Sequence, residues 1–279
     1  MPNPIVDPLV EVVDTSPTAE LVTLEGTVEG VVTVVLNRPA RKNAFDADLI
    51  SAMAEAFETL HGAEGVRVVF LKGAGGTFCA GADLDWMRAA VERSESDNRE
   101  DAFAMARMLK LLWDLPQLSV ALVEGGAFGG GAGVAAACDL AVATQDAKFS
   151  FSEVKLGLIP ATISPYVVHA IGPRAARGLF ATGRVFDAAY AERIGLISEV
   201  VPDGPGLAKA AERIAGEIMA CAPEAVAGAK RLAADVYGRH IDHHLMEDTA
   251  KRIAAARVGA EGQEGVRAFL ERRKPRWAE

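Results

Sequence analysis

Two glycine-rich turns are the first features of this sequence that indicate chemistry. They read KGAGGTFCAGADLDWM (72–87) and GGAFGGGAGVAAACDL (125–140), and each connects a predicted strand to a predicted helix. The first backbone N–H groups of a helix have no acceptor within the helix, and the helix dipole makes that end positive. Two such ends that converge can hold one developing oxyanion, and losing one donor costs roughly 100- to 1000-fold in rate. The two turns therefore predict an oxyanion site built from backbone amides.

One glutamate is the strongest candidate for proton transfer. Glu153 lies in AKFSFSEVKLGLIPATISPY (147–166), where aromatic and aliphatic residues surround it in the sequence. Apolar surroundings disfavour the charged carboxylate and raise its pKa toward the range that suits proton transfer near neutral pH. Residue type alone leaves a solvated surface glutamate as the alternative, since most glutamates lie at protein surfaces.

Two other enzymatic interpretations start from the same segments. GAGVAA (131–136) matches the loose dinucleotide-binding pattern G-x-G-x-x-A, but the predicted strand ends seven residues before its first glycine instead of directly before it. Ser150 and Ser152 precede the candidate glutamate, yet the chain has no G-x-S-x-G nucleophile elbow. Both the dinucleotide and the serine-hydrolase interpretations are therefore disfavoured.

A metal site near the C-terminus is a third alternative. His240, His244 and Glu247 have the spacing of one helix face, which would suit a metal ion. Asp242 and Asp248 belong to the same segment, so a solvated charged face is the preferred interpretation. We predict no metal.

The elements that position these residues follow an α/β pattern with βαβ-type units. Short β-branched runs predict strands at 31–36, 66–72, 119–124 and 140–144, and helical spacing of apolar residues predicts helices at 47–62 and 101–113. After VPDGPG (201–206) only amphipathic helices are predicted, at 207–221, 223–237, 241–258 and 262–273. We expect a poorly ordered tail over 1–20, an α/β core over 21–205 and a helical region over 206–279.

Composition excludes several classes of function. The net charge of −9 disfavours nucleic-acid binding, which depends on Lys and Arg neutralising phosphates. The three cysteines, Cys79, Cys138 and Cys221, are too few and too widely spaced for a disulfide framework. The N-terminus has no basic and apolar leader, and no apolar run is long enough to span a bilayer. We expect a cytoplasmic protein that binds neither nucleic acid nor membrane.

Five blocks, in order along the chain, resemble the crotonase (enoyl-CoA hydratase/isomerase) superfamily. They are NRPARKNAFD (37–46), FCAGADL (78–84), EGGAFGGGAGVAAACDL (124–140), SEVKLGLIP (152–160) and FLERRKPRW (269–277). The resemblance extends over nearly the whole chain, from about Leu21 to Trp277. It implies an α/β fold of the crotonase type, a spiral of ββα units, with a C-terminal helical region that builds a homotrimer or a dimer of trimers.

The same resemblance assigns roles to particular residues. The backbone N–H groups of Ala82 and Gly130 would hold the thioester carbonyl oxygen, and Glu153 would exchange a proton with the α carbon. Coenzyme A is part of the acyl-CoA substrate in this family, so no separate cofactor is implied. Other residues in the matching blocks would contact the substrate, chiefly its CoA part: Asp83, Leu84, Arg41, Lys42, Ala44 and, from a neighbouring subunit, Lys274.

One position departs from the pattern of the family's hydratases. Those enzymes commonly use two glutamates, and the first would fall at Gly133, where this chain has no carboxylate. The glycine would leave space near the β carbon of the substrate. A single glutamate can still serve hydration, by accepting one proton of water and delivering it to the α carbon. Whether an Asp or Ser from the 86–104 region positions the water stays open.

A finer resemblance favours one group of hydratases. The segments at 127–143 and 149–177 are similar to bacterial 3-methylglutaconyl-CoA and isohexenylglutaconyl-CoA hydratases, whose substrates are β-branched and carry a second carboxylate. For that carboxylate the sequence offers Lys155, Arg107 and His169 as candidates. We therefore expect an enoyl-CoA hydratase for such a substrate. The alternatives are a Δ3-Δ2 enoyl-CoA isomerase with the same glutamate and a non-catalytic or RNA-associated homologue.

Overall fold

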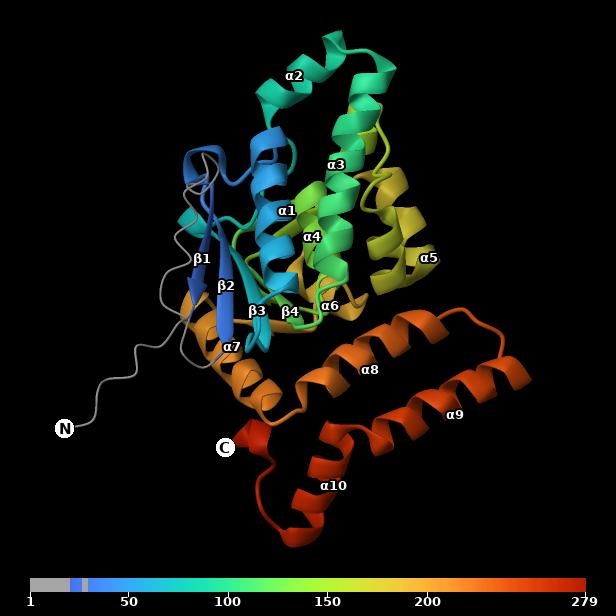
Figure 1. Cartoon of the computed structure of the whole chain (residues 1–279). Coiled ribbons are helices and arrows are strands. Elements are labelled where there is room, and N and C mark those ends of the chain that lie inside the picture. The colour runs from blue at the N-terminus through green and yellow to red at the C-terminus, as the bar shows by residue number, and fades with distance from the viewer. Residues whose placement is uncertain (1–20, 27–29) are drawn as a thin grey trace, which may run out of the picture.

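A six-stranded sheet forms the centre of the molecule in the computed structural model, which describes residues 21–26 and 30–279 (Figure 1). The expected tail over 1–20 lies outside the described residues. The strand order is β1-β2-β3-β4-β6-β9, with β1 antiparallel to β2 and every other pair parallel. The bounds are β1 Val22–Gly26, β2 Val31–Leu36, β3 Val68–Gly73, β4 Leu118–Val123, β6 Leu140–Thr144 and β9 Glu199–Val201.

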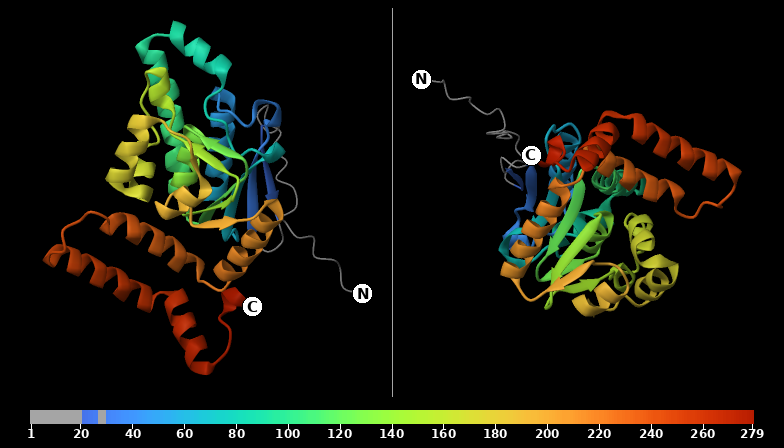
Figure 2. Two further views of the ribbon diagram at one scale, coloured as in Figure 1. Left: turned by 180° about the vertical axis from the view of Figure 1, so that it is seen from behind. Right: turned by 90° about the horizontal axis from the view of Figure 1, so that it is seen from below.

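Helices cover both faces of this sheet (Figures 1 and 2). Side chains alternate along a strand, so in β3 Val68 and Phe70 face one layer while Val69 and Leu71 face the other. The first layer contains helix α7 (Gly204–Met219), and the second contains α1 (Ala47–His61), α3 (Glu95–Trp113) and α4 (Gly130–Ala137). This alternation of side chains between the two faces of the sheet builds a three-layer core.

The predicted strands and helices are largely confirmed. The strands expected at 31–36 and 140–144 have those bounds, and the helix expected at 47–62 runs from Ala47 to His61. The helix expected at 101–113 is longer, because Ser94 and Asp97 form a reciprocal capping box that starts it at Glu95.

A second, small sheet was not predicted. It has the order β5-β7-β8, with β5 at Gly126–Phe128, β7 at Lys148–Ser150 and β8 at Phe186–Asp187. Strands of two or three residues are too short to produce a periodic pattern, so the sequence gives no sign of them. The other helices of the core are α2 (Leu84–Glu92), α5 (Ser164–Thr182) and α6 (Ala188–Arg193).

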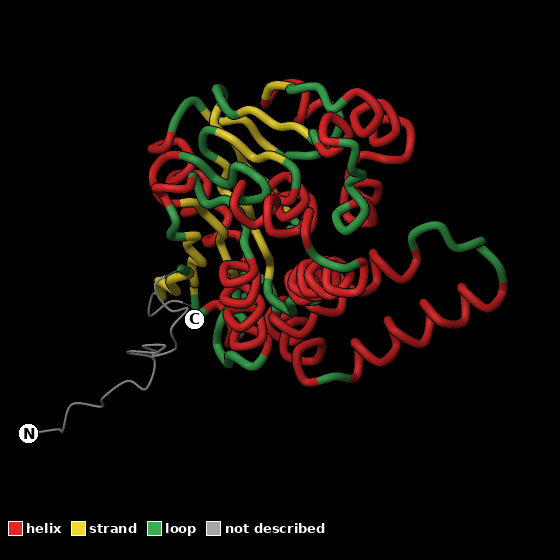
Figure 3. The backbone as a smooth tube through the Cα atoms, turned by 90° about the horizontal axis from the view of Figure 1, so that it is seen from above, coloured by secondary structure: helices red, strands yellow, loops and turns green. Residues whose placement is uncertain are grey.

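The C-terminal helices divide into two groups. Helix α7 packs on the sheet through Leu207, Ala210, Ile214 and Ile218, so the helix that follows the boundary expected at residue 205 belongs to the core. Helix α8 (Pro223–Val236) runs beside the core, and α9 (His243–Val258) and α10 (Ala260–Glu271) project beyond it (Figures 1 and 3). No helix among the described residues is long and apolar enough to cross a membrane.

Candidate active site

Three short parallel segments carry the three residues that the sequence singled out. Cys79 forms a parallel bridge with Ala127, and Ala127 in turn pairs with Phe149 in the small sheet. Ala82 lies three residues after Cys79, and Gly130 lies three residues after Ala127. Glu153 lies four residues after Phe149. Because parallel segments end at the same edge, the small sheet brings the three positions together.

The backbone at Ala82 has its N–H directed away from its neighbouring segment. Phe45 N donates to Gly81 O at 2.7 Å, and Asp83 N donates to Phe45 O at 2.8 Å. In a trans peptide the C=O and N–H point in opposite directions, so the N–H of Ala82 points away from Phe45. Among the described residues it has no backbone acceptor.

Gly130 is the first residue of α4, and its N–H is free for a different reason. Gly129 O accepts from Gly133 N at 3.0 Å, along the helix, so the N–H of the same peptide points out of the helix N-terminus. Gly129 adopts φ 50° and ψ −118°, a conformation open to glycine alone. The glycine-rich turn thus serves to turn one amide toward the site.

Both amides and the glutamate line one cavity of about 260 Å³. Its floor comes from the ends of the three segments, and its walls come from α2, α3 and the loop before α5. Glu153 and Asp101 are the charged residues of this wall within the described part of the chain. The complete lining is Phe45, Ala82, Trp86, Met87, Ala90, Asn98, Asp101, Ala102, Met105, Gly130, Glu153, Leu158, Ile159, Pro160, Thr162 and Ile163.

Glu153 is held in an environment that suits proton transfer. It is half-buried, and burial raises the pKa of its carboxyl group above the ordinary value. Oε2 is buried with no hydrogen-bond partner among the described residues. Oε1 lies 3.2 Å from the place that a Cβ on Gly129 would occupy, so the carboxylate sits directly against the oxyanion turn. The sequence-based expectation of a carboxyl group in apolar surroundings is met here.

Asp83 is a buried N-cap of helix α2 and is not exposed to the cavity. Its side chain is nearly fully buried, and Oδ1 accepts from Asp85 N at 2.8 Å, which caps α2. This backbone hydrogen bond, followed by the charge of Arg38, holds the pKa of Asp83 below its usual value, against the opposing effect of burial. Asp83 therefore has its carboxylate engaged within the protein, and the expectation that it contacts substrate is not supported. Leu84, the next residue, is 63% exposed at the start of α2.

Arg38, which no sequence pattern singles out, holds this part of the site in place. Its guanidinium lies 2.7 Å from Asp46 Oδ2 and 3.3 Å from Asp83 Oδ2, and it also donates to the carbonyl of Ala44. Ala44 itself is buried, so its side chain is not available to a ligand. These contacts join the loop at 37–46 to the first oxyanion loop.

The other basic residues expected to contact CoA lie apart from one another. Arg41 and Lys42 are exposed on the loop beside α2, where Arg41 pairs with Asp85 at 3.0 Å. Lys274 follows α10, at the end of the molecule opposite to α2 (Figure 1). Within one chain Lys274 is therefore remote from the cavity, which leaves only a contribution from a neighbouring subunit.

Gly133 does not leave the open space that the sequence predicts. A Cβ built on this residue would lie 2.1 Å from Ile163 Cγ2 and 2.6 Å from Ile163 Cβ. Gly133 is buried inside α4, and Ile163 fills the adjacent place and lines the cavity. The absence of a side chain at 133 thus permits close packing, and the expectation of vacant space is wrong.

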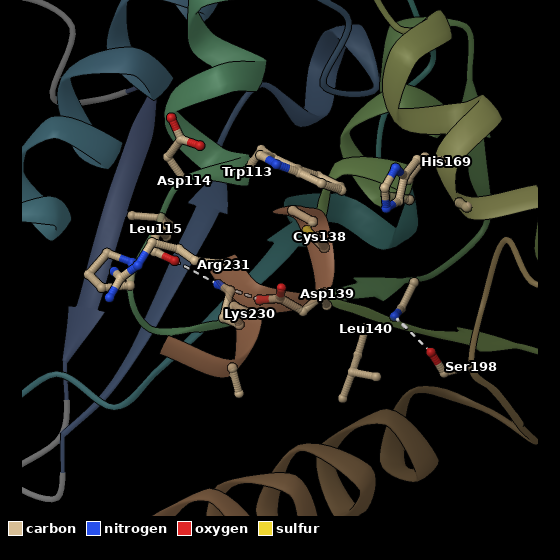
Figure 4. Close-up of a pocket in the computed structure, with 18 of the residues that line it drawn as sticks. Trp113, Asp114, Leu115, Cys138, Asp139, Leu140, His169, Ser198, Lys230 and Arg231 are labelled. Atoms are coloured by element: carbon tan, nitrogen blue, oxygen red, sulfur yellow. Dashed lines mark hydrogen bonds and ion pairs between the residues drawn. The ribbon is translucent and has the colours of Figure 1, made fainter. Parts of the chain in front are cut away.

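A larger hollow of about 860 Å³ lies between the core and α8 (Figure 4). Lys230 of α8 crosses it to Asp139, at 2.6 Å, and to the carbonyl of Leu115, also at 2.6 Å. His169 is in this hollow, where its ring lies 5.0 Å from that of Trp113. Because these contacts tie α8 to the core, the hollow is a boundary between layers, distinct from the cavity of Glu153.

None of the three candidates for binding a second carboxylate lines the cavity of Glu153. His169 is in the larger hollow, Arg107 pairs with Glu58 on the outside of α3, and Lys155 is exposed next to Gly183. These three predictions are therefore not supported.

Among the described residues no group of three or more His, Cys, Asp or Glu side chains is placed to hold a metal ion. Helix α9 begins at His243, so His240 precedes it and does not share a helix face with His244 and Glu247. A cysteine nucleophile is also disfavoured, because burial raises the pKa of the Cys79 thiol to about 12.

A cavity lined by Ala82, Gly130 and the half-buried Glu153, on a mixed α/β fold, defines a crotonase-fold enzyme. The chain belongs to the enoyl-CoA hydratase/isomerase family, whose model matches residues 26–279. A solved structure of the enoyl-CoA hydratase/isomerase (crotonase) class from Legionella pneumophila is 44% identical, with a TM-score of 0.87, and the match covers 92% of this chain and 99% of that one.

Two further relatives cover most of the chain. Pseudomonas aeruginosa AtuE is 37% identical, with a TM-score of 0.89, over 93% of this chain and all of that one. The enoyl-CoA hydratase EchA19 of Mycobacterium tuberculosis is 36% identical over 246 residues, which is 87% of this chain and 91% of the relative. The family and these relatives therefore support hydratase/isomerase chemistry on an acyl-CoA substrate for this chain.

Proposed function

We propose that this protein is an enoyl-CoA hydratase that acts on a β-branched acyl chain, with Glu153 as its proton shuttle and the amides of Ala82 and Gly130 as its oxyanion donors. The observation that carries the proposal is the single cavity that these three residues share. Two converging amides stabilise the charge that develops on a thioester oxygen when an enolate forms.

The reaction follows from these groups. Glu153, as the carboxylate, takes one proton from water while the water oxygen bonds to the β carbon. The π electrons move toward the thioester, whose oxygen becomes negative against the two amides. Glu153 then returns the proton to the α carbon, and the product is the 3-hydroxyacyl thioester. General acid–base catalysis of this kind contributes roughly 100- to 10,000-fold in rate.

The shape of the cavity supports a short or branched acyl chain. Ile159, Ile163 and Met105 contribute apolar lining to the cavity that contains Glu153. Because Ile163 fills the place beside Gly133, the β substituent of the acyl group would pack on this isoleucine instead of entering an empty space at Gly133.

A second carboxylate on the substrate would need a cation outside this cavity, since Glu153 and Asp101 are its only charged residues in the described part of the chain. A neighbouring groove shares Ile159 and Pro160 with the cavity and is lined by Arg174 and Arg177. No carboxylate of the described residues pairs with either arginine. We propose these two arginines as the partners of a carboxylated acyl end.

A substrate panel tests the proposed function. Hydration of crotonyl-CoA, 3-methylcrotonyl-CoA and 3-methylglutaconyl-CoA is followed by loss of enoyl absorbance, beside isomerisation of a 3-enoyl-CoA. We expect hydration of a branched substrate. If a carboxylated end is bound, the double change R174Q/R177Q raises KM for 3-methylglutaconyl-CoA and leaves KM for 3-methylcrotonyl-CoA unchanged. Turnover of the 3-enoyl-CoA alone would make the protein an isomerase.

A further inference from the structure

The cavity of Glu153 contains a second carboxylate, from the 86–104 region in which the sequence left open an Asp or Ser that positions water. Asp101, on α3, lines it together with Ala82, Gly130 and Glu153. The position at which the resemblance places a second carboxylate is closed, because a side chain on Gly133 would overlap Ile163. Two carboxylates, Glu153 and Asp101, therefore line the cavity in which an attacking water would bind.

Packing places the face of α3 that carries Asp101 next to the oxyanion turn. Residues four apart share a helix face, so Asp101 lies one turn before Met105 on the same side of α3. The methyl Cε of Met105 lies 3.0 Å from the place that a Cβ on Gly130 would take. The face of α3 that carries Asp101 and Met105 therefore packs beside Gly130, and all three residues line the cavity.

The polar contacts of Asp101 engage only one of its two carboxylate oxygens. Trp86 Nε1 donates to Oδ2 at 3.2 Å, and Arg93 forms an ion pair with the same oxygen. Oδ1 has no partner among the described residues. The side chain is 26% exposed, so this oxygen is accessible without being fully solvated. An acceptor fixed in this way suits a small donor such as water.

We propose that Asp101 holds the water that attacks the β carbon. The inference rests on the proposed hydratase function and names the group that supplies the missing acceptor. Oδ1 accepts a hydrogen bond from one water proton while Glu153 removes the other, and the lone pair of the water oxygen is left facing the β carbon. Asp101 stays a carboxylate throughout, and only the proton taken by Glu153 moves on to the α carbon.

The change Asp101→Ala tests this role with two reactions of the full-length protein. Hydration of 3-methylcrotonyl-CoA needs the positioned water, whereas exchange of the α protons of 3-methylbutyryl-CoA in D₂O needs only Glu153 and the two amides. We expect kcat for hydration to fall roughly 100-fold, as for a misplaced reactant, while exchange stays at the wild-type rate. Asp101→Asn, which keeps an acceptor oxygen, should recover part of the loss.

Glu100→Gln is the matched control, because it removes a carboxylate from the neighbouring, exposed residue of α3. It should leave both reactions unchanged. A fall of exchange and hydration together in Asp101→Ala would mean that Asp101 only supports the cavity wall, and an unchanged hydration rate would equally overturn the proposal. A wild-type protein that exchanges α protons but hydrates no substrate would instead refute the proposed hydratase function.

Discussion

Ile163 Cγ2 lies 2.1 Å from the place that a Cβ on Gly133 would occupy, so these two positions share the volume of one side chain. The isoleucine comes from the residue before α5 and the glycine from the middle of α4. The cavity wall beside Glu153 therefore depends on the absence of any side chain at 133.

Gly133→Ala should destabilise the fold by about 1–3 kcal/mol, the usual cost of overpacking a core. Alanine would normally stabilise a helix interior by up to about 1 kcal/mol relative to glycine, so the sign is informative. Gly216→Ala in α7 is the control, because nothing lies within 4 Å of its added Cβ. Urea unfolding of both variants checks the prediction. A Gly133→Ala variant as stable as the natural protein would contradict the observed packing.

Arg38→Ala should lower the free energy of unfolding by about 3 kcal/mol, since it leaves the buried Asp83 without its cation. Activity should fall as well, because the same guanidinium holds the loop that leads to Ala82. Arg41→Ala removes an exposed ion pair and should cost less than about 1 kcal/mol. If Arg41 meets the CoA phosphates, its change raises KM for the substrate. Equal stability losses in the two variants would refute the structural role of Arg38.

The stability of the protein should depend on pH through Glu153. Burial raises its pKa in the folded state above the ordinary value of 4.5, so the charged form destabilises the fold at pH values above 4.5. Glu153→Gln should therefore raise the free energy of unfolding at neutral pH, by roughly 1 kcal/mol for a half-buried unpaired acceptor. The gain should disappear as the pH falls below 4.5, where both states are protonated. A constant difference from acid to neutral pH would contradict this.

Assembly through the C-terminal helices should depend on their exposed apolar residues. Val266, Phe269 and Leu270 of α10 are 58%, 82% and 74% exposed within one chain. Such surfaces mark an interface. Light scattering should give a trimer or a dimer of trimers for the natural sequence and a smaller species for Phe269→Asp. A monomeric natural protein would contradict the expected assembly.

The sequence predicts the central features of the site because they depend on local patterns. The strand-turn-helix segments around Ala82 and Gly130 are continuous in sequence, and the apolar surroundings of Glu153 can be read directly. The small sheet that joins them could not be predicted, because β5 and β7 have three residues each. Residue type indicated a gap at Gly133, but only the tertiary structure brings Ile163 to the same place.

The roles of Asp83 and Arg38 could not be predicted, because they depend on contacts that the sequence does not show. An aspartate directly after an oxyanion loop suggests contact with substrate, yet its position before α2 makes it a helix cap, which only the hydrogen bond to Asp85 N reveals. Arg38 has no distinctive spacing, and its three contacts come from segments up to 45 residues apart in the chain.

The proposed mechanism is tested most directly by the rate at which Glu153→Gln hydrates a β-branched enoyl-CoA, measured together with the affinity of this variant for the CoA thioester. We predict that kcat falls by roughly 100- to 10,000-fold, since the proton shuttle is lost, while the affinity for the thioester is retained. Hydration by Glu153→Gln at the wild-type rate would contradict the assignment of Glu153 and with it the proposed mechanism.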